Sequence, residues 1–196
     1  MATEPTLHPA EHRAYRELYA ACTQLVSHWR RLAASLDGTP VGDVLNTGAA
    51  EAEELLEALG PRTAAYGLHG GPLAQGIGAR IAELRTAVTD RTGDTGLAVR
   101  SAVLDIEHVM TLLRHLAVLA RARGDEDLAR FCDEWATRIE SRLGAVREAA
   151  IDLAIDPERT AAPLDDSPLS RAAHGVGWVF GAFGEAFDRV VGGRRS

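Results

Sequence analysis

The chain has 196 residues, of which 46% are hydrophobic and 25% are charged, and its formal net charge is −7. This composition is typical of a globular domain that buries roughly 70% of its unfolded surface, and the scattered, net acidic charge argues against a nucleic-acid-binding protein, which usually has a basic face. All 21 basic residues are arginine, as is common in GC-rich bacterial genomes, and chemistry that needs a lysine, such as a Schiff base, is excluded.

Location is predicted from three features of the sequence. No run of about 20 apolar residues occurs, so no transmembrane helix is predicted. The first residues lack the basic start and apolar core of a secretory signal, which favours the cytoplasm. Cys22 and Cys132 each fall on an apolar helical stripe and are expected to be reduced core residues, although the sequence alone leaves a disulfide between them open.

The first predicted helix begins at Pro9, a residue that suits the first helical position, and residues 1–8 are expected to form a flexible tail. Up to about Leu36, apolar side chains recur every three or four residues, which places them on one helical face. These residues are Tyr15, Leu18, Cys22, Leu25, Trp29, Leu32 and Leu36. The Asp-Gly-Thr-Pro sequence at 37–40 ends the pattern.

Two further helices are predicted before the middle of the chain. The first covers about 43–59, and Gly60 and Pro61 are expected to end it. Its acidic residues are expected to face mostly water; they are Glu51, Glu53, Glu54 and Glu57. The second covers about 73–89, after a glycine-rich loop.

The stretch 97–155 is the centre of the predicted fold, because its apolar pattern indicates two long helices bent back at Gly124. The apolar residues of 99–120 recur at alternating spacings of three and four. Gly124 can adopt the left-handed conformation that ends helices, and Asp125 can cap the next one. The second arm repeats the pattern up to Pro157. Helices joined by so short a turn must pack antiparallel.

A last helix is predicted after Pro168, where Ser-Pro forms a good helix start. No convincing alternating strand pattern is present. The predicted fold is therefore an all-α, single-domain, up-and-down bundle of five to six helices at 9–191, organised around the antiparallel hairpin at about 97–155. The residues at 192–196 are expected to form a second flexible tail.

Asp105, His108 and His115 are candidate metal ligands on the first arm of the hairpin. Ferritin-like bundles hold two metal ions with carboxylates from four helices and paired Glu-x-x-His motifs, and the metal here would be iron, manganese or zinc. This chain has one Asp-x-x-His motif and no second such pair on a long helix. A polar seam between two helices, or a solvated helix face, is the favoured alternative, so no cofactor is predicted.

His8, Glu11 and His12 match the H-x-x-E-H spacing of some zinc proteases. That chemistry needs both histidines on one face of an intact helix, whereas Pro9 places the beginning of the helix between them. The favoured interpretation of this motif is an exposed helix start.

The last predicted helix contains the candidate interaction surface. Gly177 and Gly181 belong to a ladder of small residues that lets helices approach closely, and Phe180 and Phe183 form the neighbouring ridge. Docking of this helix into the bundle is favoured, and a surface for a protein partner or a homodimer is the next alternative. The few basic residues on its polar face argue against membrane-surface contact.

The sequence does not assemble a complete catalytic arrangement, so an enzyme is not indicated. The preferred hypothesis is a non-enzymatic protein-interaction or regulatory module that binds a protein partner or self-associates. Two alternatives remain open. One is the ferritin-like metal-binding bundle, and the other is a carrier that holds a small apolar ligand between its helices.

Overall fold

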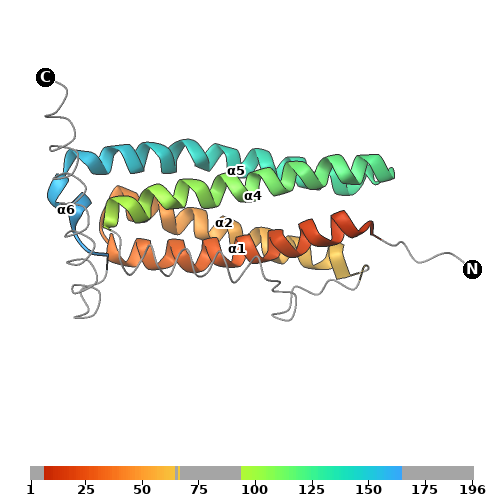
Figure 1. Ribbon diagram of the computed structural model, residues 1–196, viewed down its shortest axis with the longest axis horizontal. Coiled ribbons are helices and arrows are strands. Elements are labelled where there is room, and N and C mark those ends of the chain that lie inside the picture. Colours follow the sequence, from red (N-terminus) through yellow and green to blue (C-terminus); the bar gives the residue numbers. More distant parts are fainter. Residues whose placement is uncertain (1–6, 65, 67–93, 165–196) are drawn as a thin grey trace, which may run out of the picture.

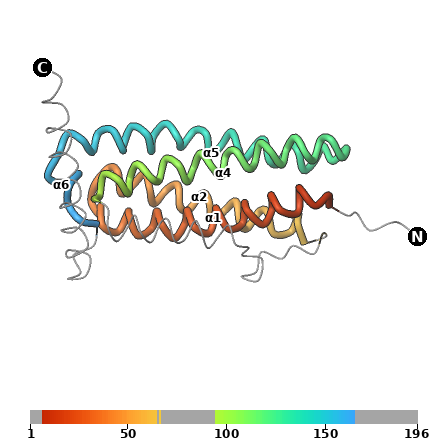
Figure 2. The backbone as a smooth tube through the Cα atoms, in the orientation of Figure 1, coloured from red at the N-terminus to blue at the C-terminus, as the bar shows by residue number. Residues whose placement is uncertain are grey.

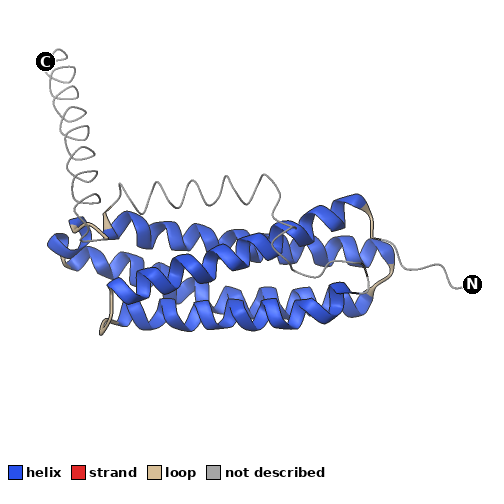
Figure 3. Cartoon of the chain, turned by 90° about the horizontal axis from the view of Figure 1, so that it is seen from below, coloured by secondary structure: helices blue, strands red, loops and turns tan. Residues whose placement is uncertain are grey.

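The computed structural model describes residues 7–64, 66 and 94–164, and this part of the chain is helical, with turns and loops between the helices and no strand (Figure 3). Four long helices lie side by side (Figure 1, Figure 2): α1 (Pro9–Ser35), α2 (Pro40–Ala64), α4 (Thr95–Arg123) and α5 (Glu126–Asp152). A 3-10 turn, η2 (Leu153–Ile155), and a short helix, α6 (Pro157–Ala161), follow at one end. The predicted all-α bundle is confirmed.

Each long helix packs against two neighbours, and neighbouring helices run antiparallel. Both α1 and α5 pack against α2 and against α4. Glu11 at the start of α1 meets Arg123 at the end of α4, and Arg62 at the end of α2 meets Phe131 at the start of α5. The antiparallel packing predicted for the hairpin is therefore found between all four neighbouring pairs.

The order of directions along the chain is up, down, down and up for α1, α2, α4 and α5 (Figure 1). Residues 66 and 94, which border the stretch that the structure does not describe, therefore lie at opposite ends of the bundle. The helix predicted at 73–89 and the last predicted helix both lie outside the described residues.

The hydrophobic core is built from the apolar stripes that the sequence predicts. Every member of the α1 stripe is at most 4% exposed. Facing residues of the other three helices, among them Leu55, Leu113 and Val146, are equally buried. Each large apolar side chain buried in this way contributes about 1.5–3 kcal/mol to stability. Within the described ranges, no helix is long and apolar enough to cross a membrane.

The hairpin turn has the predicted geometry. Gly124 ends α4 with a φ of 83°, a left-handed conformation that glycine adopts without strain. The side chain of Asp125 then accepts a hydrogen bond from the backbone N–H of Leu128 at 3.0 Å and caps α5. This turn brings α4 and α5 into direct antiparallel contact.

Helix α2 is longer at both ends than the sequence predicts. It begins at Pro40 because the Thr39 hydroxyl accepts a hydrogen bond from the backbone N–H of Gly42 at 3.1 Å and acts as the cap. The expectation that Gly60 and Pro61 end the helix is wrong, since α2 continues to Ala64. The turn after the proline is held by the buried Thr63, whose hydroxyl lies 2.7 Å from that of Tyr19.

Candidate functional site

Asp105, the first of the predicted metal ligands, is bonded to a histidine that the sequence analysis did not single out. The Nδ1–H of His28 on α1 donates to Oδ2 of Asp105 on α4 at 2.6 Å, and the two residues are 1% and 9% exposed. The helical period contained a signal for His28, which lies three residues after Leu25 and four before Leu32 on the buried face. This contact is a polar seam between α1 and α4.

The other two predicted metal ligands do not converge with Asp105. His108 is half-exposed, and its Nε2 lies 3.2 Å from Oε1 of Glu17 at the surface. His115 is exposed. Among the residues that the structure describes, no group of three or more His, Cys, Asp or Glu side chains is arranged to hold a metal ion. The three candidates therefore occupy separate environments.

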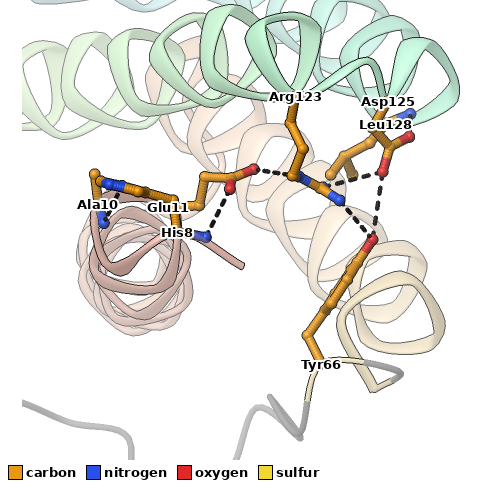
Figure 4. A network of polar contacts seen from close by, with 7 residues as sticks. All are labelled: His8, Ala10, Glu11, Tyr66, Arg123, Asp125 and Leu128. Carbon is orange, nitrogen blue, oxygen red and sulfur yellow. Dashed lines mark hydrogen bonds and ion pairs between the residues drawn. The ribbon is translucent and has the colours of Figure 1, made fainter. Parts of the chain in front are cut away.

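The H-x-x-E-H motif forms the capped start of α1 (Figure 4). Nδ1 of His8 accepts a hydrogen bond from the backbone N–H of Ala10 at 3.2 Å, and Oε2 of Glu11 accepts from the backbone N–H of His8 at 3.0 Å. These reciprocal bonds form a capping box. The predicted helix start is confirmed, but its expected exposure is wrong for Glu11, which is 2% exposed.

Arg123 explains why Glu11 is buried, because its guanidinium lies at the centre of a polar network (Figure 4). Its Nε donates to Glu11 at 3.1 Å, its Nη2 donates to Asp125 at 3.0 Å, and its Nη1 donates to the hydroxyl of Tyr66 at 3.4 Å. Burial opposes the charge on Arg123, but its hydrogen bonds to Tyr66 and Glu11, together with electrostatic attraction to the same two groups, raise its pKa. The network joins the start of α1, the end of α4 and the residues after α2.

One buried phenol and two buried thiols stay neutral at neutral pH. Burial raises the pKa of the Tyr15 phenol, and it raises the pKa values of the Cys22 and Cys132 thiols to about 12. Both cysteines are free and buried, which confirms the prediction that they are reduced residues of the core. A thiol is a poor nucleophile when it is protonated, and these two residues are therefore packing groups.

The seam between α2 and α5 is held by arginines. Glu51 was expected to face water but is only 7% exposed, because Nε of Arg142 donates to both of its carboxylate oxygens at 2.9 Å. This hydrogen bonding to Glu51 also raises the pKa of Arg142. Nearby, the guanidinium of Arg138 lies 4.7 Å from the ring centre of Trp135. The polar side chains of this seam therefore hold α2 and α5 together.

A row of apolar side chains lies on the outer face of α4. Leu97, Leu104 and Val118 are 41%, 54% and 62% exposed, and they are separated by one and two heptads. Thr111, which is also exposed, occupies the heptad position between the last two. We call these four residues the α4 row. Heptad spacing places these four residues on one face of the helix, at one of the two core positions of a coiled-coil heptad.

A groove opens where the start of α2 meets the end of α5. Its volume is about 480 Å³, and α2, α5, η2 and α6 all contribute to its walls. The apolar lining includes Val41, Val44, Ala149, Leu153 and Ile155. We call this feature the end groove. It and the α4 row are two apolar surfaces in the described part of the chain that the fold leaves open.

Comparison with known proteins does not place the chain in a family. No family model, curated protein or solved structure matches it.

The structure does not describe the residues of the interaction surface predicted on the last helix. Gly177, Phe180, Gly181 and Phe183 lie outside the described residues, and their role stays a prediction. The α4 row and the end groove both lie within the described residues.

Proposed function

We propose that this protein is a non-enzymatic interaction module that pairs with a second copy of itself through the α4 row. The observation that carries the proposal is the exposure of Leu97, Leu104 and Val118 at heptad spacing along one helix face. The row supports the self-association expected from the sequence but moves it from the last predicted helix to α4. We propose the cytoplasm as its location, since both cysteines are free.

A second copy fits this row because the row is self-complementary. In an antiparallel pair with its two-fold axis between Glu107 and His108, Leu97 faces Val118 of the second copy. Leu104 then faces Thr111 of the second copy. Every contact is made twice across the axis, so the interface is isologous and closes at a dimer.

Several charges beside the α4 row are already paired within one copy. Arg114 lies 2.6 Å from Glu140, Glu107 lies 2.8 Å from Arg147, and Arg121 pairs with Asp133. On the other side of the row, His108 contacts Glu17. Arg100, which is exposed between Leu97 and Leu104, forms no ion pair within the described residues. Its guanidinium would have to stay in water at the edge of the dimer, because burying an unpaired charge is costly.

The proposed interface is small. The row spans about 32 Å of helix at 1.5 Å per residue, and one helix pair lies at the low end of the size range for specific interfaces. We therefore expect a dimer with a dissociation constant in the micromolar range. Such weak pairing suits a regulatory module whose state depends on its concentration.

The metal-binding alternative is less well supported by the geometry. Asp105 is bonded to His28, and His108 contacts Glu17 on the surface. Both residues would have to leave these contacts in order to share a metal ion. The ferritin-like alternative thus stays a prediction without a supporting contact.

Disulfide trapping tests the register of the proposed pair. In a Leu104→Cys/Thr111→Cys variant, position 104 of one copy should bond to position 111 of the other under mild oxidation. The two positions lie about 10.5 Å apart along one helix, which is too far for a bond within one copy. Cys22 and Cys132 are buried and should not interfere.

A matched variant on α5 provides the control for this experiment. Glu134 and Ser141 are exposed and have the same seven-residue spacing, so Glu134→Cys/Ser141→Cys should form dimers only at the rate of random collision. Faster trapping at 104 and 111 supports the proposal. Equal rates in the two variants, with helicity preserved in both, would overturn it.

A further inference from the structure

The second open surface points to a different kind of ligand. We propose that the end groove binds a small apolar molecule that carries one cationic group, such as a hydrophobic amine. This site is independent of pairing through α4, because it lies at the end of the bundle formed by α2, α5, η2 and α6.

The walls of the end groove are part of the hydrophobic core. Val41 and Leu153 are 8% and 6% exposed and pack within the core cluster, so the groove is preformed by the packing of α2 against α5. Ile155 extends the apolar wall into solvent and is 83% exposed. The volume of about 480 Å³ lies within the range of roughly 300–1,000 Å³ of small-molecule sites.

The rim of the groove supplies negative charge. Glu148 and Asp152 lie one turn apart on α5, and both line the groove. Neither carboxylate forms a hydrogen bond or an ion pair with another residue of the described part of the chain. Elsewhere on α2 and α5, Glu54 and Glu140 are paired with arginines at 2.5 Å and 2.6 Å. The two rim carboxylates therefore remain available for a ligand.

The single arginine of the rim does not neutralise these two carboxylates. Nε of Arg159 lies 4.0 Å from Oδ2 of Asp156, and Oδ1 of Asp156 accepts a hydrogen bond from the backbone N–H of Arg159. Arg159 is thus directed to the acid on its own helix. Two net negative charges remain on the exposed rim beside the apolar wall, and they attract a cation.

A compact ligand fits the groove better than an extended segment does. Four elements line a space of drug-like size, whereas a docked helix needs a long groove that meets side chains over several turns. The predicted ligand places its apolar body against Val44, Ala149 and Leu153 and its cationic group between Glu148 and Asp152.

Three probes that share the same apolar cage but differ in charge separate the effect of charge on binding from the effect of shape. Adamantan-1-amine is cationic at neutral pH, adamantan-1-ol is neutral, and adamantane-1-carboxylate is anionic. Titration of the full chain, followed by NMR, should give the tightest binding for the amine and the weakest for the carboxylate. The two affinities should differ by about tenfold or more, as expected when a cation replaces an anion beside two carboxylates.

Two sets of variants complete the test. Glu148→Gln/Asp152→Asn should remove the advantage of the amine without weakening the alcohol, whereas Glu57→Gln/Glu134→Gln, with the same change in net charge away from the groove, should retain it. Ala149→Trp, and Val44→Trp on the facing wall, should abolish binding of all three probes. Equal affinities for the three probes would overturn the cationic ligand, and no binding of any probe would overturn the site itself. Either result would leave the pairing through α4 untouched, since the trapping experiment measures it separately.

Discussion

At the scale of single residues, the buried contact between His28 and Asp105 joins α1 to α4. The spacing of Asp105 and His108 is compatible with a metal site, and Asp105 does point inward. Its partner, His28, lies on a helix far away in the sequence. Local periodicity does not encode which helix faces which, so the sequence could not distinguish a metal ligand from a buried contact.

Asp105→Ala should lower the free energy of unfolding by about 3 kcal/mol, because it leaves the buried ring of His28 without the carboxylate that accepts its hydrogen bond. Asp105→Asn keeps an acceptor at the same place and should cost less. Urea unfolding with a shared slope measures both effects. His108→Ala, a surface change on the same helix, should stay within about 0.5 kcal/mol. Equal losses for Asp105→Ala and His108→Ala would contradict the structural role of Asp105.

Glu11 and Glu51 show that the sequence alone does not predict which acidic side chains are buried. Acidic side chains on amphipathic helices usually face water, and that is what the sequence predicts for them. Arg123 and Arg142, which lie far away along the chain, come to face them and allow both carboxylates to be buried. Only the assembled bundle brings these opposite charges together.

At the scale of elements, the clearest boundaries were those with strong local signals. Pro9 begins α1, and Gly124 and Asp125 form the turn of the hairpin, as the sequence predicts. The ends of α2 were not predicted, because Thr39 caps it upstream and Tyr19 holds its last turn through Thr63. The first contact is local and could have been found, whereas the second depends on tertiary packing.

Gly48 gives the prediction that belongs to the packing of α1 against α2. From the sequence it is only a weak position in a helix, but in the structure the ring of Trp29 occupies the space of its missing side chain. A Cβ at Gly48 would lie 2.2 Å from a ring atom of the fully buried Trp29. Gly48→Ala should therefore lower stability by about 1–3 kcal/mol despite the better helix propensity of alanine.

Gly144 is the matched control for this change. It lies within α5, and a Cβ added there meets nothing within 4 Å. Gly144→Ala should raise stability by up to about 1 kcal/mol through propensity alone. Thermal unfolding of both variants measures the contrast. A stabilising effect of Gly48→Ala would mean that α1 and α2 do not pack as described.

At the scale of the whole molecule, the all-α bundle could be predicted because its core follows from helical periodicity. The open surfaces could not be predicted in the same way. Leu104 and Val44 are apolar residues on amphipathic helices, and the sequence alone does not separate an apolar side chain that a neighbour covers from one that no neighbour reaches. The α4 row and the end groove appear only once the neighbours of each helix are known.

Sedimentation equilibrium over a concentration series tests most directly whether the α4 row pairs two copies of the chain. From about 1 to 200 µM, a range that brackets a micromolar dissociation constant, the weight-average mass should rise from that of one chain toward that of two. Leu104→Glu should remain monomeric over the same range with unchanged helicity. A wild-type chain that stays monomeric throughout, or a Leu104→Glu variant that dimerises as the wild type does, would contradict the account.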